Sequence, residues 1–223
     1  MNLVLLCDFD GTITTIDTAE WVLTRFAQGD WRVFDRQFEK GEITLERCLN
    51  SQFSLVKASK KQILRELKDI VVFRPNFKKL AEYCKENGIP LTIVSAGLDF
   101  VINHFLKLNS CSDLVKVCAA KTSFSANGIK LAFPPLLDKA ADNIKDDMVR
   151  RCRRYNQRVI YVGDGLADFN ALKDADYSFA IDGSRLARLC TENGMSCRTI
   201  TDFLEIIEEI RKITLQTGQD DNR

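Results

Sequence analysis

Carboxylates follow two apolar runs of the sequence at the points where those runs end. Asp8 and Asp10 come directly after LVLLC at residues 3–7, and Asp164 follows VIYV at residues 159–162. Like charges two residues apart at one strand end repel, and a bound cation offsets that cost. Carboxylate oxygens are hard ligands suited to Mg²⁺, which binds one or two carboxylates together with a phosphate. A carboxylate can also attack phosphorus to form an acyl-phosphate, so the pattern predicts phosphoryl-transfer chemistry.

Ser95 and Lys145 complete this pattern with a hydroxyl donor and a positive charge for phosphate oxygens. Ser95 follows the apolar run at residues 91–94, and Lys145 opens a predicted helix that ends near Arg154. A helix of ten residues is about 15 Å long. The strand of five residues that follows runs in the opposite direction and covers about 16 Å. Lys145 and Asp164 are therefore expected at the same edge of the sheet. Hydrolysis in two steps needs a proton donor and then a base, and Asp10 is placed for both.

Each of these residues also has an ordinary structural interpretation. An Asp or Ser after a strand most often caps a helix or forms a turn, and a single Lys is usually a solvated surface residue. Ligands of doubly wound sheets bind beyond the carboxyl ends of the strands. Several polar groups at that one edge favour the functional interpretation over the structural one.

Four short, continuous apolar runs predict strands that are buried on both faces. They occupy residues 3–7, 91–94, 159–162 and 177–181. Residues 75–87 carry apolar side chains at i, i+3, i+4 and i+7, which predicts a helix, and further helices are predicted over 145–154, 167–173 and 202–213. Alternating strands and helices predict an α/β fold, a Rossmann-like doubly wound parallel sheet with right-handed crossovers.

A helical insertion interrupts this alternation after the first strand. Between Thr14 and Arg74 only helical patterns occur, over 17–27, 31–39, 44–55 and 59–70. We expect a core domain of residues 1–13 and 75–216, a helical cap of residues 14–74 and a flexible tail of residues 217–223. The linkers at 14–15 and 73–75 are the expected hinges of a lid motion. The segment KTSFSANGIKLAF, residues 121–133, predicts a β-hairpin.

The composition excludes several classes of function. The 223 residues include 32 Lys and Arg against 31 Asp and Glu, and the net charge of +1 argues against a nucleic-acid or membrane-surface binder. Five arginines occur at 150–158, near the C-terminal end of a predicted helix. The helix dipole favours positive charge there, so these arginines do not indicate a nucleic-acid site. The single histidine, His104, cannot build a multi-histidine metal site and is expected to be a partly buried, hydrogen-bonded residue. No CxxC pair, signal-peptide pattern or long apolar run occurs, so we expect a cytoplasmic protein with reduced cysteines.

Four motifs now stand in a recognisable order. DFDGT at 8–12, the strand that ends in Ser95, Lys145, and GDGLAD at 163–168 resemble the four motifs of haloacid-dehalogenase-like phosphatases, over residues 1–213. The resemblance implies that Asp8 is the nucleophile and Asp10 the general acid/base, with Ser95 and Lys145 on the phosphoryl group. It also implies Mg²⁺ held by Asp8, the backbone carbonyl of Asp10 and Asp164, with Asp168 assisting through water or by orienting a neighbour.

Residues of the cap and of the strand ends are expected to contact the rest of the substrate. In the cap the candidates are Asp17, Glu20 and Gln52, with Trp21 and Phe38 beside them. At the strand ends we place Thr12, Ala96 and Gly97 in the same substrate-binding set. The expected partner is a small phosphorylated metabolite, and the oligomeric state stays open.

Within the family, the chain resembles the branch around phosphoserine phosphatase and 2-hydroxy-3-keto-5-methylthiopentenyl-1-phosphate phosphatase. CDFDGTIT at 7–14 and GIPLTIVSAGLDFVI at 88–102 are more similar to the second. Where the phosphoserine pattern has an Arg for the substrate carboxylate, this chain has Asn50-Ser51-Gln52. The segment LLDKAADNIK at 136–145 has no Cys, so a structural zinc site is not expected there.

Alternative functions remain open from the sequence. Phosphoserine hydrolysis and phosphoryl transfer to an alcohol would share the aspartyl-phosphate step. A non-catalytic phosphate-binding regulatory module could keep the fold and lose Asp10, but Asp10 is present. The sequence therefore favours a Mg²⁺-dependent phosphomonoesterase.

Overall fold

A mostly parallel sheet forms the centre of the protein. The structure, a computed structural model, describes residues 2–220, with the side chains of residues 216–220 left undescribed. Within this range the chain forms a seven-stranded sheet of order β4-β3-β2-β1-β5-β6-β7, and only β3 and β4 pair antiparallel. The strands are β1 (Leu3–Cys7), β2 (Leu91–Leu98), β3 (Lys116–Ser125), β4 (Gly128–Ala132), β5 (Arg158–Gly163), β6 (Tyr177–Ile181) and β7 (Arg198–Ile200). The predicted parallel α/β sheet is confirmed.

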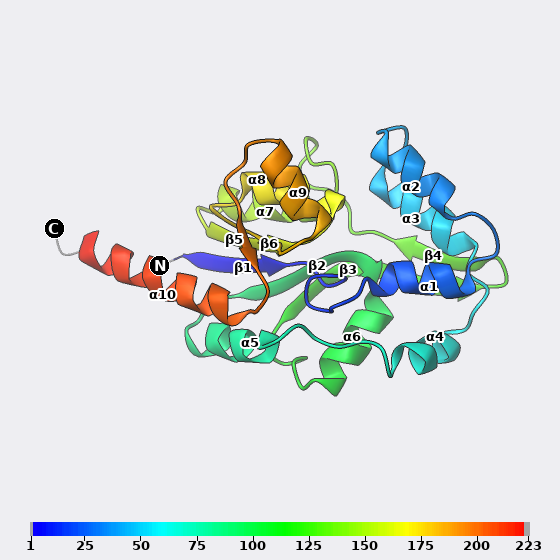
Figure 1. Ribbon diagram of the computed structural model, residues 1–223, viewed down its shortest axis with the longest axis horizontal. Helices are drawn as coiled ribbons and strands as arrows, with labels where there is room; N and C mark the ends of the chain where they lie inside the picture. Colours follow the sequence, from blue (N-terminus) through cyan, green and yellow to red (C-terminus); the bar gives the residue numbers. More distant parts are fainter. Residues whose placement is uncertain (1, 221–223) are drawn as a thin grey trace.

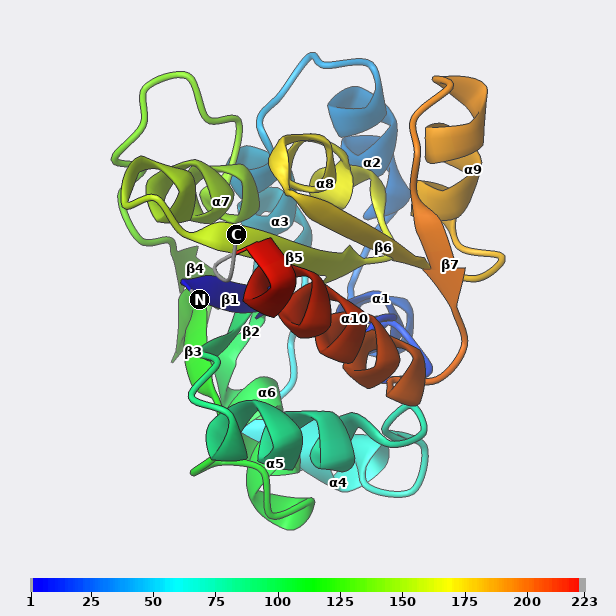
Figure 2. The ribbon, with the colours of Figure 1, turned by 90° about the vertical axis from the view of Figure 1, so that its left-hand side faces the viewer.

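Helices cover both faces of the sheet (Figures 1 and 2). One face carries α5 (Phe77–Glu86), α6 (Asp99–Leu108) and α10 (Leu204–Asp220); the other carries α7 (Ile144–Arg154), the short 3₁₀ turn η1 (Leu166–Asp168), α8 (Phe169–Asp174) and α9 (Arg185–Glu192). Strand β1 shows why both faces are apolar. Its alternate side chains Leu5 and Cys7 belong to one buried cluster, and Val4 and Leu6 belong to the other.

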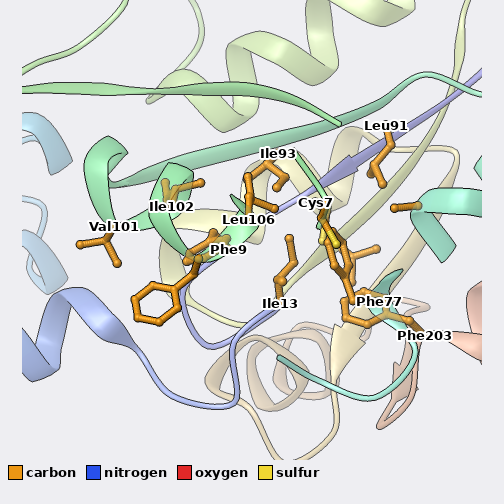
Figure 3. Packing of buried hydrophobic residues seen from close by; sticks show 14 of the residues in the cluster. Cys7, Phe9, Ile13, Phe77, Leu91, Ile93, Val101, Ile102, Leu106 and Phe203 are labelled. Carbon is orange, nitrogen blue, oxygen red and sulfur yellow. The ribbon is translucent and has the colours of Figure 1, made fainter. Parts of the chain in front are cut away.

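The larger cluster fixes the carboxyl end of β1. Figure 3 shows Cys7 and Ile93 of adjacent strands close to Leu106 and Ile102 of α6, with Phe77 of α5 near Cys7. All five of these side chains are at most 1 % exposed. This packing leaves the residues that follow β1 and β2 little freedom, so the polar groups there start from a rigid base.

The insertion after β1 is helical, as its sequence predicts. It contains α1 (Thr18–Phe26), α2 (Arg32–Glu39), α3 (Leu45–Ser54) and α4 (Lys60–Leu67), gathered at one end of the molecule in Figure 1. Asp17, Thr44 and Ser59 cap α1, α3 and α4 by accepting a hydrogen bond from a backbone N–H of the first turn. We refer to this insertion as the cap.

The two linkers of the cap run side by side. Thr14 and Phe73 form an antiparallel bridge, and the Thr15 N–H donates to the Val72 carbonyl at 2.9 Å. From the second linker, the Arg74 guanidinium donates to the carbonyls of Thr12 and Gly11, each at 2.9 Å. The end of the cap is thereby attached to the loop that follows Asp8 and Asp10.

The β3–β4 hairpin also contacts the cap. The Leu131 N–H of β4 donates to the side-chain oxygen of Asn50 in α3 at 2.9 Å. Figure 1 shows β4 extending beside α3. The hairpin predicted at 121–133 is present, and it joins the core to the cap at a second place besides the linkers.

Several elements differ from the sequence expectations. Strand β2 continues past Val94 to Leu98, and β7 and α9 were not predicted. Helix α10 continues to Asp220, so the first residues of the predicted tail have helical backbone, and residues 221–223 lie outside the described part of the chain. No helix among the described residues combines the length and apolar character that crossing a bilayer requires.

The arginines at 150–158 face protein groups. Arg150 pairs with Asp146 at 2.7 Å and Asp174 at 3.1 Å, and Arg154 pairs with Asp138 at 2.6 Å. The Arg153 guanidinium donates to the Asp174 carbonyl. These pairings neutralise much of the positive charge that the sequence concentrates there.

Candidate active site

The structure brings together six polar residues that the sequence places at one edge of the sheet. Asp8, Asp10, Ser95, Lys145, Asp164 and Asp168 all line one cavity of about 590 Å³ between the cap and the sheet. The cavity lies where β1 and β5 adjoin, which is the point where the strand order reverses direction. His104 does not line it; its ring packs edge-on against Phe105.

Lys145 lies between two carboxylates. Its Nζ is 2.9 Å from Oδ2 of Asp8 and 2.8 Å from Oδ1 of Asp168, and all three side chains are buried. The side chain of Asn143 positions Lys145 by capping α7, because it accepts from the backbone N–H groups of Lys145 and Asp146. Burial alone would lower the pKa of Lys145, but Asp168 and Asp8 offset this and raise it. Lys145 is therefore a permanent cation beside Asp8.

Asp168 is saturated with hydrogen bonds. Oδ1 accepts from Lys145 Nζ at 2.8 Å and from the Tyr161 hydroxyl at 2.6 Å. Oδ2 accepts from the backbone N–H groups of Asp164 at 3.3 Å and Gly165 at 2.9 Å. This carboxylate thus fixes both Lys145 and the turn that carries Asp164.

Tyr161 is a positioning residue that the sequence interpretation missed. It lies in β5, is fully buried, and donates its hydroxyl to Asp168. In the sequence it is one member of the apolar run VIYV. The signal that could have found it is general: a hydroxyl inside a buried strand needs a polar partner.

Replacing Tyr161 tests this role. Tyr161→Phe keeps the ring and removes one donor from Asp168, so we expect kcat to fall about tenfold and the free energy of unfolding to fall by about 1–2 kcal/mol. Steady-state kinetics and urea unfolding measure the two effects. The matched control is Tyr177→Phe on β6, whose hydroxyl contacts Arg158 away from the cavity. Wild-type turnover in Tyr161→Phe would contradict the assignment.

Asp10 is held against β2 and the start of α1. Its Oδ1 accepts from the backbone N–H of Thr18 at 3.1 Å and from the Thr18 hydroxyl. A Cβ on Gly97 would lie 2.2 Å from Asp10 Oδ2, so only glycine admits the carboxylate there. Burial raises the pKa of Asp10, opposed by the hydrogen bonds from Thr18, which favours a carboxyl group that can hold and release a proton. Thr18 is a second positioning residue that was not predicted.

Asp164 approaches the loop after Asp10 closely. The Thr12 hydroxyl donates to Oδ1 of Asp164 at 2.8 Å. A Cβ on Gly11 would lie 2.3 Å from Oδ2 of Asp164, and the φ of Gly11 is +72°. Both the close contact and the left-handed backbone conformation require glycine at this position. Thr12 is fully buried and does not line the cavity, so the structure places it beneath Asp164 and not against the substrate space where it was predicted.

The acidic residues form a set that suits a divalent cation. Carboxylate oxygens of Asp8, Asp164 and Asp168 lie within 4.8 Å of one another. Burial and neighbouring carboxylates raise the pKa of Asp8, with Lys145 opposing. Burial and Asp168 raise the pKa of Asp164 to about 6. Oxygen donors that repel one another and are drawn together by the fold fit a hard cation such as Mg²⁺. Because Asp168 is already saturated, Asp8 and Asp164 are the better ligands.

The cap forms the opposite side of the cavity. Asp17, Glu20 and Gln52 line it, as does Phe38, while Ala96 and Gly97 line it from β2. Trp21 does not line the cavity and packs edge-on against Phe26. Trp31, Asp35, Leu45 and Leu49 also line the cavity, and none of these four was among the predicted residues.

Comparison with known proteins agrees with this geometry. Residues 5–173 match the family described as haloacid dehalogenase-like hydrolase. The chain belongs to this family, and it is a phosphatase. It is 30 % identical over 220 residues to a 2-hydroxy-3-keto-5-methylthiopentenyl-1-phosphate phosphatase of Brevibacillus brevis, covering 95 % of this chain and 96 % of the relative. The protein of that name from Geobacillus thermodenitrificans is 28 % identical, covering 95 % and 97 %.

Solved structures show the same fold at lower identity. A substrate-bound phosphoserine phosphatase complex superposes with a TM-score of 0.69 at 17 % identity, covering 94 % of this chain and 98 % of the other. A phospho-aspartyl intermediate analogue of phosphoserine phosphatase gives a TM-score of 0.68 at 17 % identity, covering 93 % and 98 %. These likenesses establish the shared fold.

Proposed function

We propose that this chain is a Mg²⁺-dependent phosphomonoesterase that hydrolyses 2-hydroxy-3-keto-5-methylthiopentenyl-1-phosphate or a closely related small metabolite. The observation that carries the proposal is the group of buried Asp8, buried Lys145 and half-buried Asp164 at the base of a cavity of about 590 Å³. The relatives named for that substrate support the choice of substrate. In this proposal the core domain, residues 1–13 and 75–216, supplies the catalytic groups. The cap, residues 14–74, determines which substrate binds.

Asp8 performs the first step in the proposed mechanism. An oxygen of Asp8 attacks phosphorus, the bond from phosphorus to the ester oxygen breaks, and Asp10 gives its proton to the departing alcohol. Lys145 and Ser95 hold the phosphoryl oxygens. Asp10 then takes a proton from water, which attacks the aspartyl-phosphate, releases phosphate and restores Asp8. Asp8 and Asp164, with the backbone carbonyl of Asp10, would hold Mg²⁺, which supplies positive charge against the phosphoryl oxygens when bound.

A substrate panel tests the proposal. Purified protein with Mg²⁺ is assayed for phosphate release from the methylthiopentenyl enol phosphate, phosphoserine, pyridoxal phosphate and several sugar phosphates. We expect the enol phosphate to give the highest kcat/KM. Added alcohols with analysis of phosphorylated products separate hydrolysis from phosphoryl transfer. A higher kcat/KM for phosphoserine would reject the substrate, and no phosphate release from any member would reject the activity.

Metal affinity should depend on pH in a defined direction. Because the pKa of Asp164 is raised to about 6, the metal-free protein binds a proton there at lower pH, and the ion must displace it. We expect the apparent Kd for Mg²⁺ to rise by at least about tenfold per pH unit below pH 6, because burial also raises the pKa of the second ligand, Asp8. Calorimetric titrations at pH 5.0, 6.0 and 7.5 at fixed ionic strength measure this. Equal affinity at pH 5.0 and 7.5 would contradict it.

A further inference from the structure

Asp35 is a carboxylate on the cap side of the cavity that has no cation beside it. Asp35 of α2 lines the cavity, and its Oδ1 accepts from Gln52 Nε2 at 2.7 Å and lies 3.8 Å from the Cys48 sulfur. Both contacts are with neutral groups. Within residues 2–220 no Lys or Arg forms an ion pair with Asp35.

The arginines that line the same cavity are matched with other groups. Arg36 lies 2.9 Å from Asp30, and Arg185 of the core lies 2.7 Å from Glu39. Arg32 stacks 4.2 Å from the centre of the Trp31 ring and lies 3.8 Å from Glu20. Each positive charge on this side therefore already has a negative or aromatic partner, whereas Asp35 keeps an uncompensated negative charge.

Gln52 fixes the position of that charge. It is 1 % exposed, and its amide nitrogen lies 2.7 Å from Asp35 and 3.5 Å from the Trp31 carbonyl. An ionised carboxylate and a carbonyl only accept hydrogen bonds, so the NH₂ end of the amide must face both. The Asp35 carboxylate is thereby held toward the cavity by a neutral donor, which orients it without cancelling its charge.

The surroundings of Asp35 would repel a second anion. Burial raises the pKa of Asp35, the hydrogen bond from Gln52 lowers it, and the nearby carboxylates Glu20 and Glu39 raise it. Trp31, Leu45 and Leu49 belong to the apolar part of the same lining. A like charge placed against an unpaired carboxylate in a partly enclosed site is a repulsive element of the kind that produces specificity.

We propose that Asp35, held by Gln52, is a specificity-determining residue that excludes phosphate esters carrying a second anionic group. The cavity then selects phosphate esters whose remaining part is neutral or cationic and partly apolar. This inference rests on the proposed phosphatase activity and narrows its substrate class. The competing arrangement is that Arg32 or Arg36, both exposed, leaves its partner and binds an anionic tail.

Two matched substrate pairs test the proposal. Phenyl phosphate and 4-carboxyphenyl phosphate differ by one carboxylate, and so do phosphoethanolamine and phosphoserine. The kcat/KM of each is measured with Mg²⁺ at pH 7.5 for wild type, Asp35→Asn and Asp35→Glu. Asp69→Asn, an exposed cap carboxylate outside the cavity, is the control for loss of one charge. Thermal unfolding verifies that each variant folds.

We expect wild type to prefer the member without the carboxylate at least tenfold in both pairs. Asp35→Asn should reduce that preference at least fivefold, while Asp35→Glu and Asp69→Asn keep it. An unchanged preference in Asp35→Asn overturns the proposal. A wild-type preference for the carboxylate-bearing member also overturns it and favours the arginines. If wild type releases phosphate from none of these esters and from no member of the substrate panel, the proposed activity itself fails, whereas hydrolysis of both members of each pair at equal rates rejects only the role of Asp35.

Discussion

Asp8→Asn should abolish phosphate release, with turnover at least about 10⁴-fold below wild type. The substitution keeps the shape of the side chain and replaces the nucleophilic carboxylate by a neutral amide. Lys145 retains its contact with Asp168, so the local structure should persist. The measurement is phosphate release with Mg²⁺ from an aryl phosphate, combined with acid quenching and mass analysis of the protein. Wild type should show a transient mass increase of one phosphoryl group, and the variant should show none.

Asp10→Asn serves as the matched comparison for Asp8→Asn. It keeps the nucleophile but cannot act as a base in the second step. With an activated aryl phosphate, whose leaving group needs no proton, it should accumulate the phosphorylated protein. The two Asp→Asn variants thus separate formation of the intermediate from its hydrolysis. Phosphorylation of Asp8→Asn at wild-type level would contradict the assignment of the nucleophile.

Lys145→Met should damage both stability and catalysis. Met is similar in length and neutral, so Asp8 and Asp168 remain buried without their shared cation. Breaking a buried ion pair in this way costs about 3–5 kcal/mol in free energy of unfolding. Loss of the positive charge beside the phosphoryl group should also lower kcat/KM by about 10³-fold. Urea unfolding and steady-state kinetics measure the two effects.

The stability loss in Lys145→Met should depend on pH. Burial already raises the pKa of Asp8, and without the opposing charge of Lys145 it rises further, so the folded variant binds more protons than the unfolded one. Its stability then falls as pH rises, and the deficit relative to wild type should be smaller at pH 5 than at pH 8. Lys79→Met, at an exposed lysine of α5, is the control and should change neither quantity. A deficit that does not vary with pH would contradict this account.

The polar residues at the strand ends could be predicted because two simple regularities act together. Continuous apolar runs identify buried strands, and the carboxyl ends of parallel strands meet at one edge of the sheet. Asp8 and Asp164 follow such runs directly. Lys145 could be placed by the lengths of one helix and one strand. The structure puts all three against one cavity.

The residues that orient these groups were not predictable in the same way. In the sequence, Tyr161 is one member of an apolar strand pattern, and Thr18 is one of the first residues of a helical pattern. Their roles depend on which side chain faces them, Asp168 and Asp10 respectively, and those pairs are set by tertiary packing. Strand β7 has only three residues and shows no pattern, whereas α9 carries Leu186 and Cys190 at helical spacing on its buried face, a signal that could have found it. Asp35 and Trp31 were missed because a helix pattern does not reveal which face meets the cavity.

The paired linkers of the cap have a consequence for how this chain can vary. Thr14 and Phe73 face each other across a bridge, so the core meets the whole cap as one loop whose ends are already together. The chain entropy lost on closing such a loop grows only with the logarithm of its length, about 0.6 kcal/mol for each doubling. The cap can therefore lengthen or shorten at little cost to the folding of the sheet. Changes in substrate preference can arise there while the strand ends that hold the carboxylates remain as they are.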